Sequence, residues 1–188
     1  MLKRKIYDKI QNWKKVSDGR TALLIEGARR VGKSKIVEYF AENEYRSYII
    51  VDFARPKDGI VEAITKRPDD LDGFFNLLML SYGVKLYRRE SVIVFDEVQL
   101  CPPARQLIKY LVEDGRYDYI ETGSLISLKR NVEKISIPSE EETLPVKVIY
   151  CSSHPAFSAV QRVIEPADVV EHYHNYKKNS LYRHALVA

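Results

Sequence analysis

Short apolar runs alternate with segments of helical spacing along most of the chain. The apolar runs predict strands over residues 21–26, 48–51, 91–95, 117–122 and 146–150. Apolar positions three and four apart predict helices over residues 3–17, 33–43, 57–83 and 102–113, the third of these holding one or two helices. Because the strand runs are apolar throughout, they are typical of a parallel sheet that helices cover on both faces. The pattern predicts an α/β fold.

The pattern weakens after Cys151, which divides the chain into two unequal parts. We expect residues 1–150 to form one domain, with an N-terminal helix within residues 1–18, and residues 151–188 to form a divergent or truncated tail. A chain of 188 residues is long enough for one such core and short for two. The candidate chemistry is therefore sought within the first part.

A complete phosphate-binding motif, G-x-x-x-x-G-K-[ST], lies between the first predicted strand and the helix after it. Its residues are Gly27, Ala28, Arg29, Arg30, Val31, Gly32, Lys33 and Ser34, and the predicted nucleotide-binding segment also includes Lys35. The glycines let the backbone approach an anion, while successive amides and the helix start donate to phosphate oxygens. Lys33 is expected to neutralise the β- and γ-phosphates, and Ser34 to offer its hydroxyl to Mg²⁺. The motif predicts an ATP site, and whether Arg29 and Arg30 touch phosphate, a partner or solvent stays open.

Two adjacent acids, Asp96 and Glu97, follow the apolar run 91–95. Carboxylate oxygens suit a hard divalent cation, so Asp96 is expected to hold Mg²⁺. Side chains alternate along an extended chain, so Glu97 is expected to face a different way, towards the attacking water. The pair predicts the metal side and the water side of the same site.

Polar residues near two other strand ends extend the predicted site. Ser124, or else Thr122, is expected to sense the γ-phosphate, and Gln99 is left open between a loop residue and one that orients water. Asp52 also ends a strand and is interpreted as a turn residue. Because the carboxyl ends of parallel strands meet at one edge, these segments are expected to converge. The predicted catalytic residues are Glu97, Lys33 and Ser124, and the predicted metal ligands are Ser34 and Asp96.

Three segments together resemble prokaryotic AAA-type ATPases of the ASCE division of P-loop proteins, in the group that carries a C-terminal domain of unknown function. These segments are residues 27–34, 95–99 and 122–124, and the resemblance covers roughly residues 1–150. It implies a three-layer P-loop NTPase fold with a mainly parallel five-stranded sheet in the order 5-1-4-3-2. The roles it implies are the Walker A pair for Lys33 and Ser34, the Walker B magnesium acid for Asp96 and the catalytic base for Glu97.

The end of the chain departs from that family. Members usually continue past the fifth strand with a lid and a long C-terminal domain, and neither is recognisable after Tyr150, so we expect a truncated member. No apolar stretch approaches the roughly 20 residues that span a bilayer, and no signal peptide is recognisable. Two distant cysteines, Cys101 and Cys151, indicate free thiols in a reducing compartment, so we expect a cytoplasmic protein that does not enter a membrane.

The motifs predict an ATPase that hydrolyses ATP to ADP and phosphate with Mg²⁺. Its turnover is expected to be slow in isolation, because the lid and its arginine are not recognisable. The alternative is a nucleotide-gated binding or regulatory module with little turnover. The formal charge of +4 gives only weak support for a nucleic-acid partner. A homo-oligomer or a protein partner, and the process that ATP drives, stay open.

Overall fold

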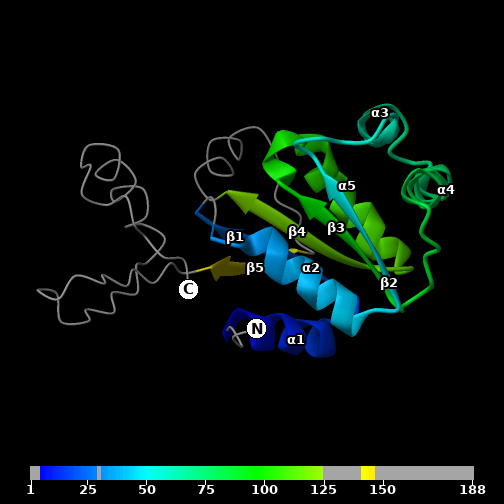
Figure 1. Ribbon diagram of the computed structural model, residues 1–188. Helices are drawn as coiled ribbons and strands as arrows, with labels where there is room; N and C mark the ends of the chain where they lie inside the picture. Colours follow the sequence, from blue (N-terminus) through cyan, green and yellow to red (C-terminus); the bar gives the residue numbers. More distant parts are fainter. Residues whose placement is uncertain (1–4, 29–30, 125–140, 147–188) are drawn as a thin grey trace, which may run out of the picture.

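The structure is a computed structural model that describes residues 5–28, 31–124 and 141–146. Along the chain the elements are α1 (Lys5–Ser17), β1 (Ala22–Gly27), α2 (Lys33–Glu44), β2 (Ser47–Asp52), α3 (Ile60–Lys66), α4 (Leu71–Tyr82), β3 (Ser91–Asp96), the 3₁₀ helix η1 (Val98–Leu100), α5 (Pro102–Asp114), β4 (Asp118–Ser124) and β5 (Glu141–Val146). Figure 1 shows how the helices pack around the one sheet that the strands form. The predicted tail, residues 151–188, lies outside the described residues.

All five strands belong to one parallel sheet in the order β2-β3-β4-β1-β5. Read from the other edge, this is the order 5-1-4-3-2, so the predicted α/β fold with a P-loop NTPase sheet is confirmed. β4 lies between β1 and β3. The strand before the glycine loop and the strand before the acid pair are therefore both neighbours of β4.

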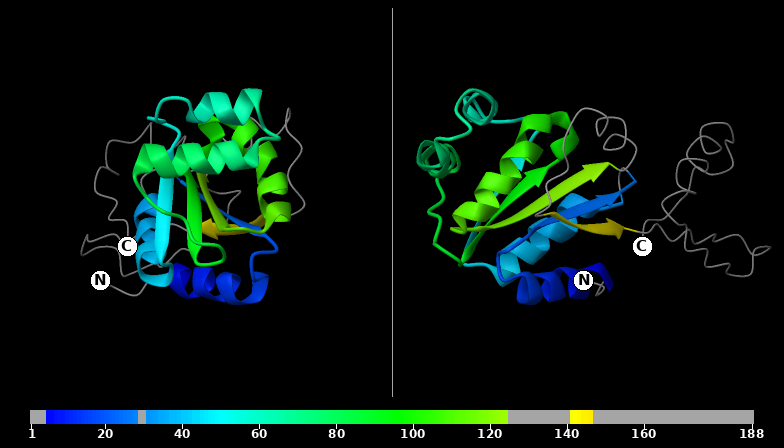
Figure 2. Two further views of the ribbon diagram at one scale, coloured as in Figure 1. Left: turned by 90° about the vertical axis from the view of Figure 1, so that its right-hand side faces the viewer. Right: turned by 180° about the vertical axis from the view of Figure 1, so that it is seen from behind.

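Helices cover both faces of the sheet, as the largely apolar strands β1 and β3 require. α1 and α2 lie on one face, and α3, α4 and α5 lie on the other (Figures 1 and 2). Trp13 of α1 and Phe40 of α2 share one buried cluster, while Phe75 of α4 and Leu107 of α5 belong to a second. None of the helices among the described residues is long and apolar enough to cross a membrane.

The predicted helical segment 57–83 contains two helices, α3 and α4. α3 ends before Arg67, and α4 begins after Asp70, whose side chain accepts a hydrogen bond of 2.8 Å from the amide of Gly73. An aspartate that accepts from the amide three residues later is a standard helix start. The capping contact therefore explains why one apolar segment holds two helices.

The fifth strand is displaced from its predicted position. We predicted it at residues 146–150, but β5 covers Glu141–Val146, and residues 147–150 lie outside the described part of the chain. Within the described sheet β5 pairs with β1 alone, so it is an edge strand. An edge strand tolerates a proline such as Pro145 and exposed acids such as Glu142, which a buried central strand does not.

Candidate functional site

The carboxyl ends of β1, β3 and β4 meet at one edge of the sheet. Gly27, the last residue of β1, is in register with Ser124, the last residue of β4. On the other side of β4, Phe95 is in register with Glu121, which places Asp96 beside the end of β4. The glycine loop, the acid pair and the end of β4 are thus brought together, although they are far apart in sequence.

The glycine loop folds around the side chain of Lys33. Gly32 precedes α2 with φ of 82° and ψ of 25°, a left-handed conformation in which glycine is favoured. The ammonium group of Lys33 donates hydrogen bonds to the carbonyls of Gly27, at 3.1 Å, and Ala28, at 2.8 Å. Lys33 is only 5% exposed, which is unusual for a lysine and shows that the loop encloses it.

Other members of the predicted nucleotide-binding segment differ in how they are placed. Val31 is buried, whereas Lys35 is exposed and its ammonium lies 2.7 Å from Glu38 one turn further along α2. The side chain of Lys35 therefore points away from the loop that encloses Lys33. Arg29 and Arg30 lie outside the described residues, so their contacts stay open.

The predicted metal ligands are in direct contact. The hydroxyl of Ser34 donates a hydrogen bond of 2.7 Å to Oδ1 of Asp96. The hydroxyl of Thr122 donates to the same oxygen. Asp96 is therefore held by the first turn of α2 and by the end of β4. The Ser34 hydroxyl and the Asp96 carboxylate lie together beside the glycine loop.

Glu97 leaves the strand in a strained conformation. Its φ of 55° and ψ of 44° are left-handed, which is uncommon for a residue other than glycine. β3 ends at Asp96, so the extended alternation that we assumed for the two acids is wrong. The amide of Glu97 donates to Oγ1 of Thr122 at 3.2 Å, and its carbonyl accepts from the amide of Leu100 at 2.9 Å. Such strain persists only where neighbouring contacts hold it in place.

Gln99 is part of the site, which the sequence left open. Its side-chain amide nitrogen donates to Oε2 of Glu97, and its side-chain oxygen accepts from the amide of Ser124 at 3.2 Å. Gln99 is 5% exposed and Ser124 is 3% exposed. The hydrogen bond between Gln99 and Ser124 joins η1 to the last residue of β4. In the sequence, the only sign that Gln99 belongs to the site was its position two residues after Glu97.

Asp52 lies directly beside Asp96 in the parallel ladder of β2 and β3. Its carboxylate accepts a hydrogen bond of 2.8 Å from the amide of Ala54 and lies 3.5 Å from the guanidinium of Arg55. An aspartate that bonds the amide two residues later forms a typical turn. The geometry agrees with our interpretation of Asp52 as a turn residue.

A buried charge cluster, formed by Arg105, Glu121 and Glu141, lies beneath α5. Nη2 of Arg105 donates to the two carboxylate oxygens of Glu141 at 2.9 and 2.7 Å, and Nε lies 3.7 Å from Glu121. Burial, and then the nearby carboxylate of Glu141, raise the pKa of Glu121 well above its ordinary value of 4.5. The cluster links α5, β4 and β5, and nothing in the sequence indicated that these charges meet.

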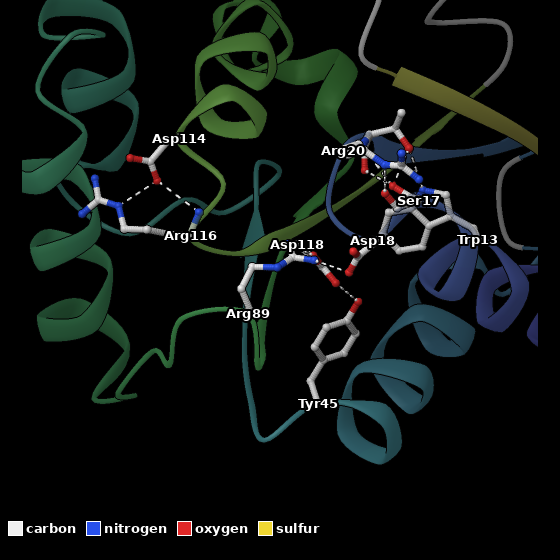
Figure 3. Close-up of polar contacts among 10 residues, drawn as sticks. Trp13, Ser17, Asp18, Arg20, Tyr45, Arg89, Asp114, Arg116 and Asp118 are labelled. Carbon is white, nitrogen blue, oxygen red and sulfur yellow. Dashed lines mark hydrogen bonds and ion pairs between the residues drawn. The ribbon is translucent and has the colours of Figure 1, made fainter.

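A second polar network lies at the opposite edge of the sheet, where the strands begin (Figure 3). The guanidinium of Arg89 donates to Asp118 at 2.8 Å and to Asp18 at 3.2 Å, and the hydroxyl of Tyr45 donates to Asp118 at 2.7 Å. Burial, together with the Asp118 carboxylate, raises the pKa of Tyr45 above its ordinary value. A shallow cavity of about 400 Å³ opens beside this network. The polar network lies far from the glycine loop and joins the turn after α1 to the starts of β3 and β4. This position indicates a structural role for the network.

Comparison with known proteins agrees with this geometry. A family model described as an AAA domain matches residues 19–143. The matched span includes the glycine loop, the acid pair and the end of β4, and it ends within β5. No curated protein matches the chain.

Proposed function

This chain belongs to the AAA domain family. From this membership and the geometry of the site, we propose that it binds ATP with Mg²⁺ and hydrolyses the nucleotide to ADP and phosphate. The observation that carries the proposal is the 2.7 Å hydrogen bond between Ser34 and Asp96. It joins the phosphate motif at the start of α2 to the acid pair at the end of β3. The acid pair alone would not distinguish a metal site from an acidic loop that follows a core strand.

The phosphate side of the site would be formed by the glycine loop and Lys33. Backbone amides at the start of α2 would donate to phosphate oxygens, helped by the positive end of the helix. The ammonium of Lys33 already lies within the loop, where it bonds the carbonyls of Gly27 and Ala28. We propose that it exchanges these carbonyls for oxygens of the β- and γ-phosphates, since an anionic acceptor makes the stronger hydrogen bond.

The metal side would be formed by Ser34 and Asp96. A hydroxyl and a carboxylate are oxygen ligands of the kind that Mg²⁺ prefers, and these two lie in direct contact. Ser34 is exposed and Asp96 is half-buried, so both can be reached from the solvent side. When bound, Mg²⁺ would supply positive charge against the β- and γ-phosphate oxygens.

The water side would be formed by Glu97. Its carboxylate would accept a proton from a water molecule as the water oxygen bonds to the γ-phosphorus. The bond between the γ-phosphorus and the bridging oxygen breaks, and its electron pair stays on ADP. Glu97 then releases the proton to solvent, so that ATP and water become ADP, inorganic phosphate and a proton.

Two assays on the same preparation test this proposal. Calorimetric titration with ATP, in the presence and absence of Mg²⁺, measures binding, and steady-state release of phosphate measures turnover. Asp96→Asn should weaken the Mg²⁺-dependent part of the affinity, and Asp8→Asn, an exposed aspartate on α1, serves as the matched control. ATP binding with repeated release of phosphate supports an ATPase. ATP binding without release of phosphate would instead support the nucleotide-gated module. Absence of ATP binding would contradict both.

A further inference from the structure

Gln99 occupies a position between the proposed base and the end of β4. One end of its side chain donates to Oε2 of Glu97, and the other end accepts from the amide of Ser124 at 3.2 Å. At 5% exposure Gln99 is a buried polar side chain, which normally persists only when both of its ends are satisfied. The two bonds orient its amide, because the nitrogen can only donate and the oxygen can only accept.

The backbone of Glu97 does not by itself fix where the carboxylate lies. The residue is outside β3 and has left-handed backbone angles, so the regular sheet no longer determines its direction. Its carboxylate is three rotatable bonds away from that backbone. A contact to the carboxylate itself is therefore needed if the base is to be held against one water molecule.

β4 is connected to both acids, directly through Thr122 and indirectly through Gln99. Thr122 donates to Asp96 and accepts from the amide of Glu97 at 3.2 Å. Gln99 adds a second connection, from the Glu97 carboxylate to the last amide of the same strand. β4 is also the strand whose end lies in register with Gly27, at the start of the phosphate loop. The position of the acid pair is thus defined relative to the strand that adjoins the phosphate loop.

We infer that Gln99 is a positioning residue, which fixes the carboxylate of Glu97 relative to the end of β4 and leaves Oε1 of Glu97 to accept the proton from water. This rests on the proposed ATPase function. Gln99 acts through Glu97, so its loss should lower kcat while the phosphate loop and the metal ligands continue to bind ATP. A misplacement of the reacting groups by about 1 Å costs up to about 100-fold in rate.

Substitutions at Gln99 separate the two ends of its side chain. Gln99→Leu removes the bonds to Glu97 and Ser124 at similar volume. Gln99→Glu keeps an acceptor for Ser124 but places a second carboxylate against Glu97. We expect each to lower kcat about 10- to 100-fold, with the KM for ATP changed less than about twofold because ground-state binding is kept. Gln106→Leu, at an exposed glutamine of α5, is the matched control and should behave as the parent. ATP affinity and thermal unfolding of each variant show that it has folded.

A double substitution distinguishes positioning from a merely structural role. Once Glu97→Gln has removed the carboxylate, adding Gln99→Leu should reduce turnover by less than about twofold more, because the two residues act as one unit. If Gln99→Leu instead lowers turnover by the same factor in both backgrounds, or leaves kcat unchanged in the parent, the inference is wrong and the ATPase proposal stands. If the parent shows no turnover that depends on Glu97, the ATPase proposal fails and this inference fails with it.

Discussion

Thr122 on β4 and Asp96 on β3 are joined by a hydrogen bond from the threonine hydroxyl to Oδ1 of the aspartate. The same hydroxyl accepts from the amide of Glu97, so one buried oxygen contacts both members of the acid pair. The sequence offered Ser124 as the preferred sensor of the γ-phosphate, with Thr122 as the alternative. The geometry gives Thr122 the contacts with the acids, and Ser124 stays a prediction.

Thr122→Val should lower turnover about 10- to 100-fold while ATP continues to bind. Valine keeps the shape of threonine but can neither donate to Asp96 nor accept from Glu97, so both acids lose a contact that fixes them. Phosphate release and calorimetric ATP affinity are measured side by side. Thr65→Val, on the exposed face of α3, is the control. Turnover equal to that of the parent would show that Thr122 does not position the acids.

Lys33→Ala should weaken ATP binding by roughly 10- to 100-fold, the loss expected for a hydrogen bond to a charged group worth about 1.5–3 kcal/mol. The side chain is enclosed by the loop, so no neighbouring side chain can replace it easily. Lys109→Ala, an exposed lysine on α5, removes the same charge elsewhere. Calorimetric titration with ATP is the measurement. Equal affinities for Lys33→Ala and the parent would exclude the phosphate role of Lys33.

Arg105→Met should lower the free energy of unfolding by about 3–5 kcal/mol, because it leaves the buried carboxylate of Glu141 without its cation. The Arg105 and Glu141 side chains are 5% and 1% exposed. Lys66→Met breaks an ion pair whose side chains are 72% and 59% exposed, and it should cost less than about 1 kcal/mol. Urea unfolding followed by circular dichroism compares the two. Similar small losses in both variants would mean that the buried cluster adds little stability.

The pKa of Glu121 predicts how stability depends on pH. Because its folded-state pKa is raised above 4.5, the folded protein keeps a proton that the unfolded chain releases. The resulting contribution to stability is present in full below 4.5 and is lost as the pH rises towards the folded-state pKa. Glu121→Gln cannot ionise, so its stability relative to the parent should increase between pH 4.5 and neutral pH.

Urea unfolding of the parent and of Glu121→Gln across that range checks this prediction. Glu42→Gln, an exposed glutamate on α2, is the control and should track the parent at every pH. A difference between Glu121→Gln and the parent that stays constant with pH would show that Glu121 releases its proton equally in the folded and unfolded chains.

Features set by neighbouring residues could be predicted from the sequence. The glycine loop is local, because the strand, the turn and the helix that form it lie within residues 22–44. The apolar strands likewise indicated the parallel sheet, since β1, β3 and β4 are buried along almost their whole length. The strand order came from the resemblance to AAA-type ATPases, because hydrophobic periodicity alone does not predict the order of strands in a sheet.

Individual side-chain contacts between residues far apart in the sequence could not be predicted. Arg105 meets Glu141 across 36 positions, and Gln99 meets Ser124 across 25, and no periodicity marks such contacts. The left-handed turn at Glu97 also escaped prediction, because glutamate does not favour this conformation and the Thr122 hydroxyl that its amide contacts is 25 positions away. β5 was misplaced for a related reason: residues 146–150 are the more apolar run, but the edge of the sheet accepts the more polar Glu141–Val146.

Steady-state phosphate release by the parent and by Glu97→Gln is the most direct test of ATP hydrolysis at this site. The amide keeps the size of the side chain but cannot accept a proton from water, so turnover should fall roughly 10²- to 10⁴-fold, the usual contribution of a general base. ATP and Mg²⁺ binding should persist, because the phosphate loop, Ser34 and Asp96 are unchanged. A parent that releases phosphate repeatedly, with a Glu97→Gln variant that binds ATP and does not, is the predicted result. Equal turnover by the two proteins would contradict it and would place the base elsewhere.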